Sequence, residues 1–327
     1  METRTAARLG VPVSEIGFGA WAIGGTWGEV SQQDAEAALN AALDAGVTFI
    51  DTADVYGAGR SEQIIGKVLS ERGGERPFVA TKAGRGGPNT PESYTRAYLE
   101  GCIDQSLANL RTDSLDLLQL HCPHPAVYYM PEVFGVLDDI VATGKLKRYG
   151  VSVEKVEEGL KAIEYPNVAS VQIIYNIFRQ RPARLFFREA EKKGVAIVAR
   201  VPLASGLLTG KMSADSTFAA DDHRTFNREG EAFDKGETFA GVPFDEGLAA
   251  VEALRPLVPA DASMAAFALR WILMDPAVAV VIPGAKNADQ ALGNAAASDL
   301  PALSDETIAA VRAIYEERIG PHVDPRW

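Results

Sequence analysis

Four polar residues follow short apolar runs at three places in the sequence: Asp51, Tyr56, Lys82 and His121. A tyrosine phenol can donate a proton to an oxygen that gains negative charge, and a neighbouring ammonium such as Lys82 lowers the pKa of the phenol. Asp51 could hold that ammonium by a charge-assisted hydrogen bond, and a ring N–H of His121 could stabilise the same developing charge. Taken singly, Asp51 could equally cap a turn, and His121 could be a structural residue.

The elements that must position these residues are short apolar runs that alternate with helical patterns. The strand-like runs are EIGFGAW (15–21), VTFID (47–51), PFVATK (77–82), LDLLQLH (115–121), LKRYGVS (146–152), ASVQIIYN (169–176), VAIVARVP (195–202) and VAVVIPG (278–284). Helical patterns are found at 32–45, 61–70, 91–110, 131–143, 154–164, 182–193, 246–257, 262–274 and 287–297.

Such serial units indicate a parallel sheet covered by helices, and eight of them favour an α/β fold of the closed (β/α)₈ TIM-barrel type. The only candidate linker, roughly residues 204–244, lies inside the seventh unit. We therefore predict a single domain over residues 1–327, with a long loop after the seventh strand and a C-terminal helical extension. In such a barrel the carboxyl ends of the strands share one mouth, so the four residues should converge there.

Composition restricts the possible partners. The net charge of −12 disfavours nucleic acid and anionic membranes, and no apolar run is long enough for a membrane span. The two cysteines, Cys102 and Cys122, form neither a CxxC pair nor a disulfide framework, which favours a cytoplasmic location.

The motif HCPH resembles a metal pair by residue type, but Pro123 breaks the spacing and no second cluster exists, so no metal site is expected. The oligomeric state stays open.

The segments FIDTADVYG, SEQIIGKVL, VATK and LLQLHCP resemble the aldo-keto reductase superfamily. The resemblance continues through GFGAWAIGG, GVS, VQIIYN, PLASGLLTGK and VIPGAKNADQALGN, and so covers nearly the whole chain. It implies an Asp, Tyr, Lys and His tetrad on a (β/α)₈ barrel. It also implies an oxidoreductase that reduces small aldehydes and ketones, including aldoses, to alcohols by hydride transfer, with Tyr56 as general acid. The implied cofactor is NADPH, with NADH as a weaker substitute.

The sequence has no G-x-G-x-x-G after a strand, which argues against a Rossmann site. In VIPGAKNADQALGN, the first amides of a helix and Lys286 could bind phosphate. The resemblance assigns three groups of cofactor contacts. These are Gly284, Lys286, Gln290 and Asn294 for the adenosine phosphate and adenine, Leu203, Ser205, Leu207 and Lys211 for the pyrophosphate, and Ser152 and Gln172 for the nicotinamide carboxamide.

Two positions depart from the pattern of the family. Val153 replaces an asparagine that touches the carboxamide in many relatives, and Arg200 replaces a tyrosine that stacks on the nicotinamide ring. Because a guanidinium plane can also stack on an aromatic ring, we predict that Arg200 serves as the platform.

Residues after the first, second and fourth strands could line a substrate cleft, although ordinary packing is an alternative for each of them. They are Trp21, Trp27, Val55, Cys122, Tyr128 and Tyr129. Two other functions stay open. Lys82 could form a Schiff base, as in class I aldolases, or the chain could be a non-catalytic, cofactor-binding subunit that resembles channel β-subunits.

Overall fold

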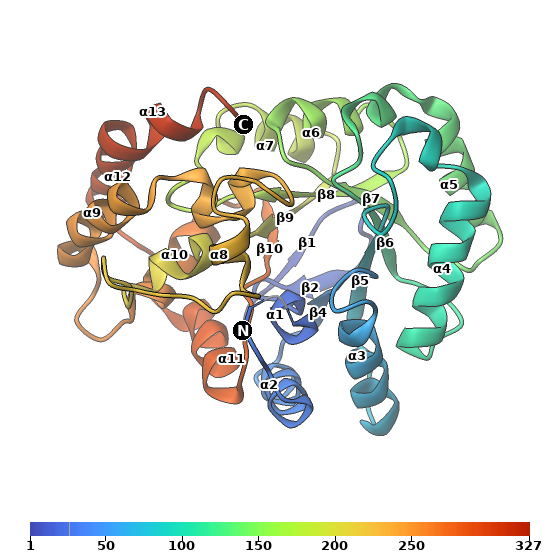
Figure 1. Cartoon of the computed structure of the whole chain (residues 1–327), viewed down its shortest axis with the longest axis horizontal. Coiled ribbons are helices and arrows are strands. Elements are labelled where there is room, and N and C mark those ends of the chain that lie inside the picture. Colours follow the sequence, from blue (N-terminus) through green and yellow to red (C-terminus); the bar gives the residue numbers. More distant parts are fainter. Residues whose placement is uncertain (26) are drawn as a thin grey trace.

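The computed structural model describes residues 1–25 and 27–327. Eight parallel strands form one curled sheet in sequence order (Figure 1). These are β3 (Phe18–Gly19), β4 (Phe49–Asp51), β5 (Phe78–Ala83), β6 (Leu117–His121), β7 (Tyr149–Ser152), β8 (Val168–Ile174), β9 (Ala196–Arg200) and β10 (Val278–Val281). Parallel bridges from Ile16 to Val281 and from Gly19 to Gly284 join the first strand to the last. The closed sheet confirms the predicted α/β TIM barrel.

Helices surround the sheet (Figure 1). They are α1 (Trp21–Gly24), α2 (Gln32–Asp44), α3 (Arg60–Glu71), α4 (Arg96–Leu110), α5 (Pro131–Ala142), α6 (Val156–Ala162), α7 (Phe186–Lys192), α8 (His223–Phe226), α9 (Phe244–Leu254), α10 (Met264–Leu273), α11 (Ala288–Ala295), α12 (Asp305–Ile314) and α13 (Gly320–Val323). Helices α12 and α13 form the predicted C-terminal extension. Among the described helices, none has the length and apolar character needed to cross a membrane.

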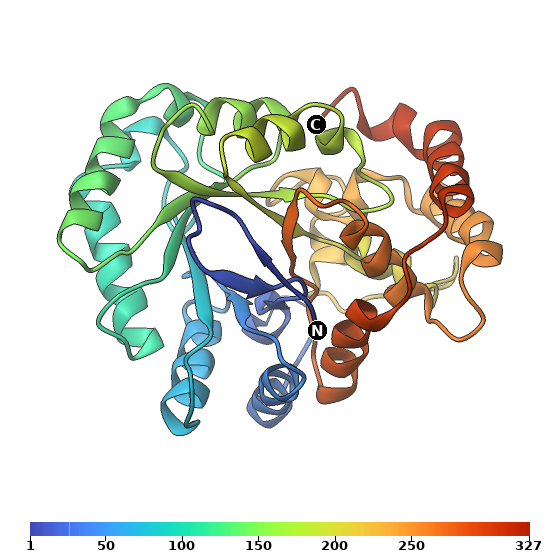
Figure 2. The same cartoon turned by 180° about the vertical axis from the view of Figure 1, so that it is seen from behind.

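A short hairpin was not predicted from the sequence. Strands β1 (Thr3–Thr5) and β2 (Pro12–Ser14) pair antiparallel and lie across the end of the barrel opposite the mouth (Figure 2). Arg4 fixes the hairpin there by donating hydrogen bonds to the backbone carbonyls of Leu273, Asp275 and Val278. Runs of three residues are too short to show a strand period, so sequence patterning could not reveal them.

The inward face of the barrel changes from apolar to polar along β4, β5, β6 and β9. Near the hairpin, the interior is filled by side chains such as Phe49, Ala80 and Leu117. Because side chains two apart point to the same side of a strand, Asp51 and Lys82 lie on this inward face, one step closer to the mouth. The sequence therefore fills one end of the barrel with a packed core and reserves the other end for polar groups.

The loop between β9 and α9 (residues 201–243, the long loop) contains several short helical turns besides α8. Its backbone is strained, with left-handed φ angles at Val201 (51°), Ala204 (47°), Ser205 (53°), Phe239 (51°) and Ala240 (58°). Such conformations cost free energy and persist only where the surrounding structure fixes them, which happens most often at functional sites.

Candidate active site

The four candidate residues meet at the carboxyl ends of β4, β5 and β6, as the sequence predicted. The Lys82 Nζ donates hydrogen bonds to Asp51 Oδ2 (2.6 Å), to the carbonyl oxygen of Thr52 (2.8 Å) and to Tyr56 Oη (3.2 Å). The Tyr56 ring packs edge-on against the imidazole of His121, with the ring centroids 5.9 Å apart. The tetrad is thus a contiguous cluster that runs from a carboxylate to a phenol and an imidazole.

Two glutamines hold the Asp51 carboxylate in place. The second oxygen, Oδ1, accepts hydrogen bonds from Gln172 Nε2 (2.7 Å) and Gln119 Nε2 (3.4 Å). Because Lys82 occupies Oδ2, both carboxylate oxygens have partners, as a buried charge requires. Gln172, which the resemblance assigned to the cofactor, therefore also fixes Asp51.

The pKa values of Lys82 and Tyr56 agree only in part with the prediction. Burial opposes the charged form of Lys82, but Asp51 and Tyr56 outweigh it and raise the pKa of this amine, so it stays an ammonium. Burial raises the pKa of the Tyr56 phenol, and Lys82 offsets this effect only in part. The predicted net lowering of the Tyr56 pKa is therefore wrong for this structure, because desolvation of the phenolate exceeds the attraction of the ammonium. Tyr56 is a protonated phenol near neutrality, as a proton donor must be.

His121 is held in its neutral form. Burial and then the nearby charges of Arg85 and Lys82 lower the pKa of the imidazole well below its usual value. The Nε2 atom lies 3.5 Å from Nη1 of Arg85, and Nδ1 has no hydrogen-bond partner among the described residues. A neutral imidazole with one ring N–H can still donate a hydrogen bond to a ligand oxygen.

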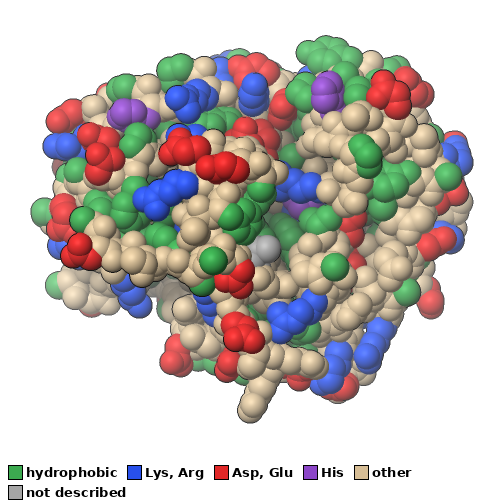
Figure 3. Space-filling view, viewed as in Figure 1, with side chains coloured by type: hydrophobic (Ala, Val, Ile, Leu, Met, Phe, Trp, Pro, Cys, Tyr) green, Lys and Arg blue, Asp and Glu red, His purple; other side chains and the backbone are tan. Residues whose placement is uncertain are grey.

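A cavity of about 540 Å³ opens beside the tetrad. The space-filling view shows this face of the molecule hollowed near its centre (Figure 3). Most of the predicted site residues line the cavity, namely Trp21, Trp27, Asp51, Tyr56, His121, Gln172, Arg200, Leu203, Ser205, Lys211, Gly284, Lys286, Gln290 and Asn294. Others lie outside its lining, namely Val55, Lys82, Cys122, Tyr128, Ser152 and Leu207. The Tyr129 side chain is 69% exposed and points to solvent.

Three basic side chains, Lys211, Arg224 and Lys286, line the cavity. Lys286 donates a hydrogen bond to the carbonyl oxygen of Trp27, and Lys211 is exposed. Neither lysine forms an ion pair with a described residue. Arg224 of α8, which was not predicted from the sequence, also lines the cavity, lies 5.2 Å over the Trp27 ring and pairs with Asp222 (2.6 Å). Lys211 and Lys286 are therefore available to stabilise a phosphate-bearing ligand.

The wall between the two ends of the cavity is aromatic. Trp21 stacks on Tyr56 with centroids 6.0 Å apart and meets Trp27 edge-on at 5.3 Å. The His223 ring of the long loop lies 4.9 Å from Trp21 and 4.3 Å from Trp27. The two tryptophans thus form an apolar wall of the cavity, and their contact with a substrate stays a prediction.

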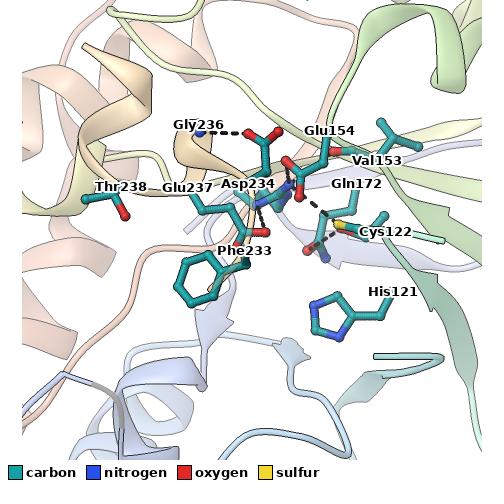
Figure 4. A network of polar contacts seen from close by, with 12 residues as sticks. His121, Cys122, Val153, Glu154, Gln172, Phe233, Asp234, Gly236, Glu237 and Thr238 are labelled. Carbon is teal, nitrogen blue, oxygen red and sulfur yellow. Dashed lines mark hydrogen bonds and ion pairs between the residues drawn. The ribbon is translucent and has the colours of Figure 1, made fainter. Parts of the chain in front are cut away.

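A buried ion network beside His121 was not predicted. It consists of Arg85, Glu154, Arg200 and Glu237, here called the mouth network. Arg85 binds Glu237 through two hydrogen bonds (2.6 and 3.3 Å), and Arg200 Nη2 lies 2.7 Å from Glu154 Oε2. In Figure 4 the side chains of Glu154 and Glu237 converge above His121 from different segments of the chain. Arg85 and Glu154 each follow a strand by two residues, a signal that sequence reasoning could have used.

Of the two carboxyl groups in the mouth network, that of Glu237 carries the negative charge and that of Glu154 does not. Burial opposes its ionisation, but Arg85 and Arg200 outweigh it and lower the pKa of its carboxyl. For Glu154, burial is the main effect and raises the pKa to about 8. Arg200 is engaged by this network, so its predicted role as a platform for the nicotinamide stays a prediction.

Three possible metal ligands, Cys122, Glu154 and Glu237, have atoms within 4.8 Å of one another. Burial raises the pKa of the Cys122 thiol well above its usual value, so the thiolate that a metal needs is disfavoured. The guanidinium groups of Arg85 and Arg200 already bind the carboxyl groups of Glu237 and Glu154. This arrangement fits an ion network better than a cation site.

The segment that carries Glu237 is fixed by Trp327. The indole Nε1 donates a hydrogen bond to Asp234 Oδ1 (2.8 Å), which also accepts one from the Gly236 backbone N–H (2.7 Å). The guanidinium of Arg179 lies 4.3 Å over the indole ring and donates a hydrogen bond to the Ala240 carbonyl. Residues far apart in sequence thereby hold the long loop against the mouth.

Comparison with known proteins agrees with this geometry. The aldo/keto reductase family model matches residues 15–316. The chain is 32% identical to the aldo-keto reductase YhdN of Bacillus subtilis, a match that covers 100% of this chain and 97% of that protein. It is 28% identical to the aldo-keto reductase yakc [NADP(+)] of Schizosaccharomyces pombe, over 96% of this chain and 92% of that protein.

A solved structure is similar over nearly the full length. The glycerol dehydrogenase AKR11B4 from Gluconobacter oxydans superposes with a TM-score of 0.79 at 30% sequence identity, covering 99% of this chain and 98% of that one. The match of the family model to most of the chain shows that this protein belongs to the aldo/keto reductase family.

Proposed function

We propose that this protein, a member of a family of oxidoreductases that act on carbonyl groups, reduces small aldehydes and ketones to alcohols with NADPH. The observation that carries the proposal is the contact chain from Asp51 through Lys82 to Tyr56 at the edge of the cavity. We further propose that residues 1–327 act as one catalytic domain, because the bridge from Gly19 to Gly284 joins the first strand of the barrel to the segment that follows the last.

Tyr56 serves as the general acid in this proposal. The substrate carbonyl oxygen would accept hydrogen bonds from Tyr56 Oη and from a ring N–H of His121. As negative charge develops on that oxygen, the phenol gives up its proton to form the alcohol. The Lys82 ammonium, 3.2 Å away, stabilises the resulting phenolate, and Asp51 keeps the ammonium charged and oriented.

A reduced nicotinamide cofactor, when bound, supplies the hydride that no side chain can deliver. The cavity fits such a group, because its far end offers Lys211, Arg224 and Lys286 for phosphates. At Gly284 an added Cβ would meet nothing closer than 3.7 Å, so the backbone is open to a ligand there. The name of the relative yakc includes NADP(+), which also supports the choice of cofactor.

The contacts of Lys82 argue against the Schiff-base alternative. A nucleophilic lysine must be a neutral amine that the substrate can reach. Lys82 is fully buried, its pKa is raised, and it donates to three oxygens at once. The alternative of a non-catalytic, cofactor-binding subunit predicts no turnover, so an activity assay decides it.

The net charge of −12 favours a small carbonyl substrate over nucleic acid as the partner. A cytoplasmic location, also part of the proposal, would keep the free thiols of Cys102 and Cys122 reduced.

The test is a screen of aldehydes, aldoses and ketones with NADPH and NADH in parallel, on the wild type and on Tyr56→Phe. The variant removes one oxygen and little volume, so it should bind NADPH normally while reduction falls by about 100-fold or more. Normal turnover of Tyr56→Phe would refute the assignment of the acid. Absence of turnover by the wild type with all carbonyls would favour the subunit alternative.

A further inference from the structure

We propose that Glu237 selects uncharged carbonyl substrates, because its carboxylate fills the place between Arg85 and Arg200 where a substrate carboxylate would otherwise bind. The inference rests on the proposed carbonyl reduction and adds a specificity determinant to it.

The two arginines lie close to the place where the reacting oxygen would be. Nη1 of Arg85 lies 3.5 Å from Nε2 of His121, the ring that would contact the carbonyl oxygen. Arg200 lines the same cavity as Tyr56 and His121. A carboxylate one to three carbons away from the carbonyl would therefore come within reach of guanidinium groups, which bind carboxylates in a bidentate manner.

Glu237 already occupies these guanidinium groups. Its Oε1 lies 2.6 Å from Arg85 Nη2 and 3.7 Å from Arg200 Nη1, so one carboxylate oxygen bridges both arginines. The side chain is 3% exposed and itself lines the cavity. A substrate carboxylate would have to approach a second, buried negative charge or displace it, and both are unfavourable.

The remaining cation near the reacting oxygen is also engaged. Lys82 pairs with Asp51 and Arg224 pairs with Asp222, whereas Lys211 and Lys286, which also line the cavity, form no ion pair with a described residue. The described part of the cavity thus leaves positive charge available at its phosphate end and compensates it at its carbonyl end. An uncharged carbonyl compound enters the carbonyl end without disturbing any ion pair.

The long loop supplies Glu237 and holds it in place. The Ser205 hydroxyl donates a hydrogen bond to the Glu237 carbonyl oxygen (3.0 Å), and the neighbouring Asp234 is bound by Trp327. The backbone of Glu237 is therefore fixed independently of its carboxylate. A change of charge at this side chain should alter specificity without releasing the loop.

The test compares substrates that differ only in charge. Pyruvate and pyruvamide form one pair, and succinate semialdehyde and its amide form the other. The ratio of kcat/KM for the acid to that for the amide is measured with NADPH in the wild type and in Glu237→Gln. Neutralising Glu237 removes the nearest partner of Arg85 (2.6 Å), whereas Arg200 stays paired with Glu154 (2.7 Å). Arg85 then gains a charge-assisted contact with the substrate carboxylate, so the ratio should rise by about 10- to 100-fold for at least one pair.

Three variants serve as controls. Glu237→Asp keeps the charge and should retain a ratio close to that of the wild type. In the double variant Arg85→Gln/Glu237→Gln, loss of the freed cation should reverse most of the gain. Glu231→Gln removes a carboxylate from an exposed part of the same loop and should leave the ratio unchanged.

A second measurement is independent of turnover. Pyruvate should raise the melting temperature of Glu237→Gln more than pyruvamide does, whereas for the wild type pyruvate should raise it no more than pyruvamide does. If Glu237→Gln is too unstable for kinetics, Glu237→Met, which is uncharged and similar in volume, is examined by the same two methods. An unchanged acid-to-amide ratio, together with equal thermal shifts, would overturn the inference even if the wild type reduces carbonyls normally. Absence of wild-type reduction would instead refute the proposed function, and the thermal shifts would still decide whether Glu237 excludes carboxylates.

Discussion

Two ion pairs in this protein have the same N–O distance but differ completely in burial. Lys82 and Asp51 are 2.6 Å apart with side chains 0% and 3% exposed, whereas Lys145 and Asp104 are 2.6 Å apart with side chains 50% and 55% exposed. Asp51→Asn leaves the buried ammonium without its counter-charge, which typically costs about 3–5 kcal/mol of unfolding free energy. Asp104→Asn is the matched control and should leave the unfolding free energy nearly unchanged, because water screens the exposed charges.

The unfolding free energy of Asp51→Asn should also depend on pH in a characteristic way. Without Asp51, burial is the dominant effect on Lys82 and pushes its folded-state pKa below the unfolded value of about 10.4. Above this lowered pKa, the unfolded state binds more protons than the folded state, so the stability of the variant rises with pH. The loss of unfolding free energy relative to the wild type should therefore be larger at about pH 6 than at about pH 9.

Urea unfolding followed by far-ultraviolet circular dichroism at both pH values measures these losses. A loss below about 1 kcal/mol, or one that is the same at both pH values, would show that Lys82 does not depend on Asp51 for its charge.

Two further predictions concern the cofactor and the packing of the barrel. Lys286→Ala should weaken the binding of NADPH by about one to two decades and leave NADH nearly unchanged, since only NADPH carries a 2′-phosphate for this ammonium to contact. Titration of both cofactors by quenching of the intrinsic fluorescence measures the losses, and equal losses would place Lys286 away from that phosphate. Gly66→Ala in α3 should destabilise the protein by about 1–3 kcal/mol, because its Cβ would lie 2.2 Å from the backbone oxygen of Asn109. Gly101→Ala in α4 is the matched control, because a Cβ there meets nothing within 4 Å, and it should stabilise the helix by about 0.5–1 kcal/mol in thermal unfolding. Similar effects of the two glycine substitutions would contradict this view of how α3 packs against α4.

The sequence predicted the barrel well because strands and helices have distinct periods. Asp51, Lys82 and His121 end apolar runs, and a parallel sheet brings the ends of its strands to one edge, so their convergence followed from position alone. The predicted helix at 91–110 begins later, as α4, because the Thr95 hydroxyl accepts a hydrogen bond from the Tyr98 N–H and caps the helix there.

The mouth network could not be predicted in the same way. Arg85, Glu154 and Glu237 lie on three loops, and no periodicity relates a residue of one loop to a residue of another. The net pKa of Tyr56 was also beyond reach, because it depends on the balance between burial and the Lys82 charge. Both properties are set by distances across the mouth, which spacing along the chain does not encode.

The contact between Trp327 and the long loop has a consequence for the order of folding. Strand β10 must pair with the first part of the barrel before the sheet closes, and Asp234 gains its indole partner only when residue 327 is available. During synthesis from the amino terminus, the long loop therefore lacks this contact until residue 327 has left the ribosome. Contacts this distant in sequence are among the slowest to form. The mouth of the barrel, with Glu237 set between its arginines, should accordingly be the last part of the molecule to reach its final arrangement.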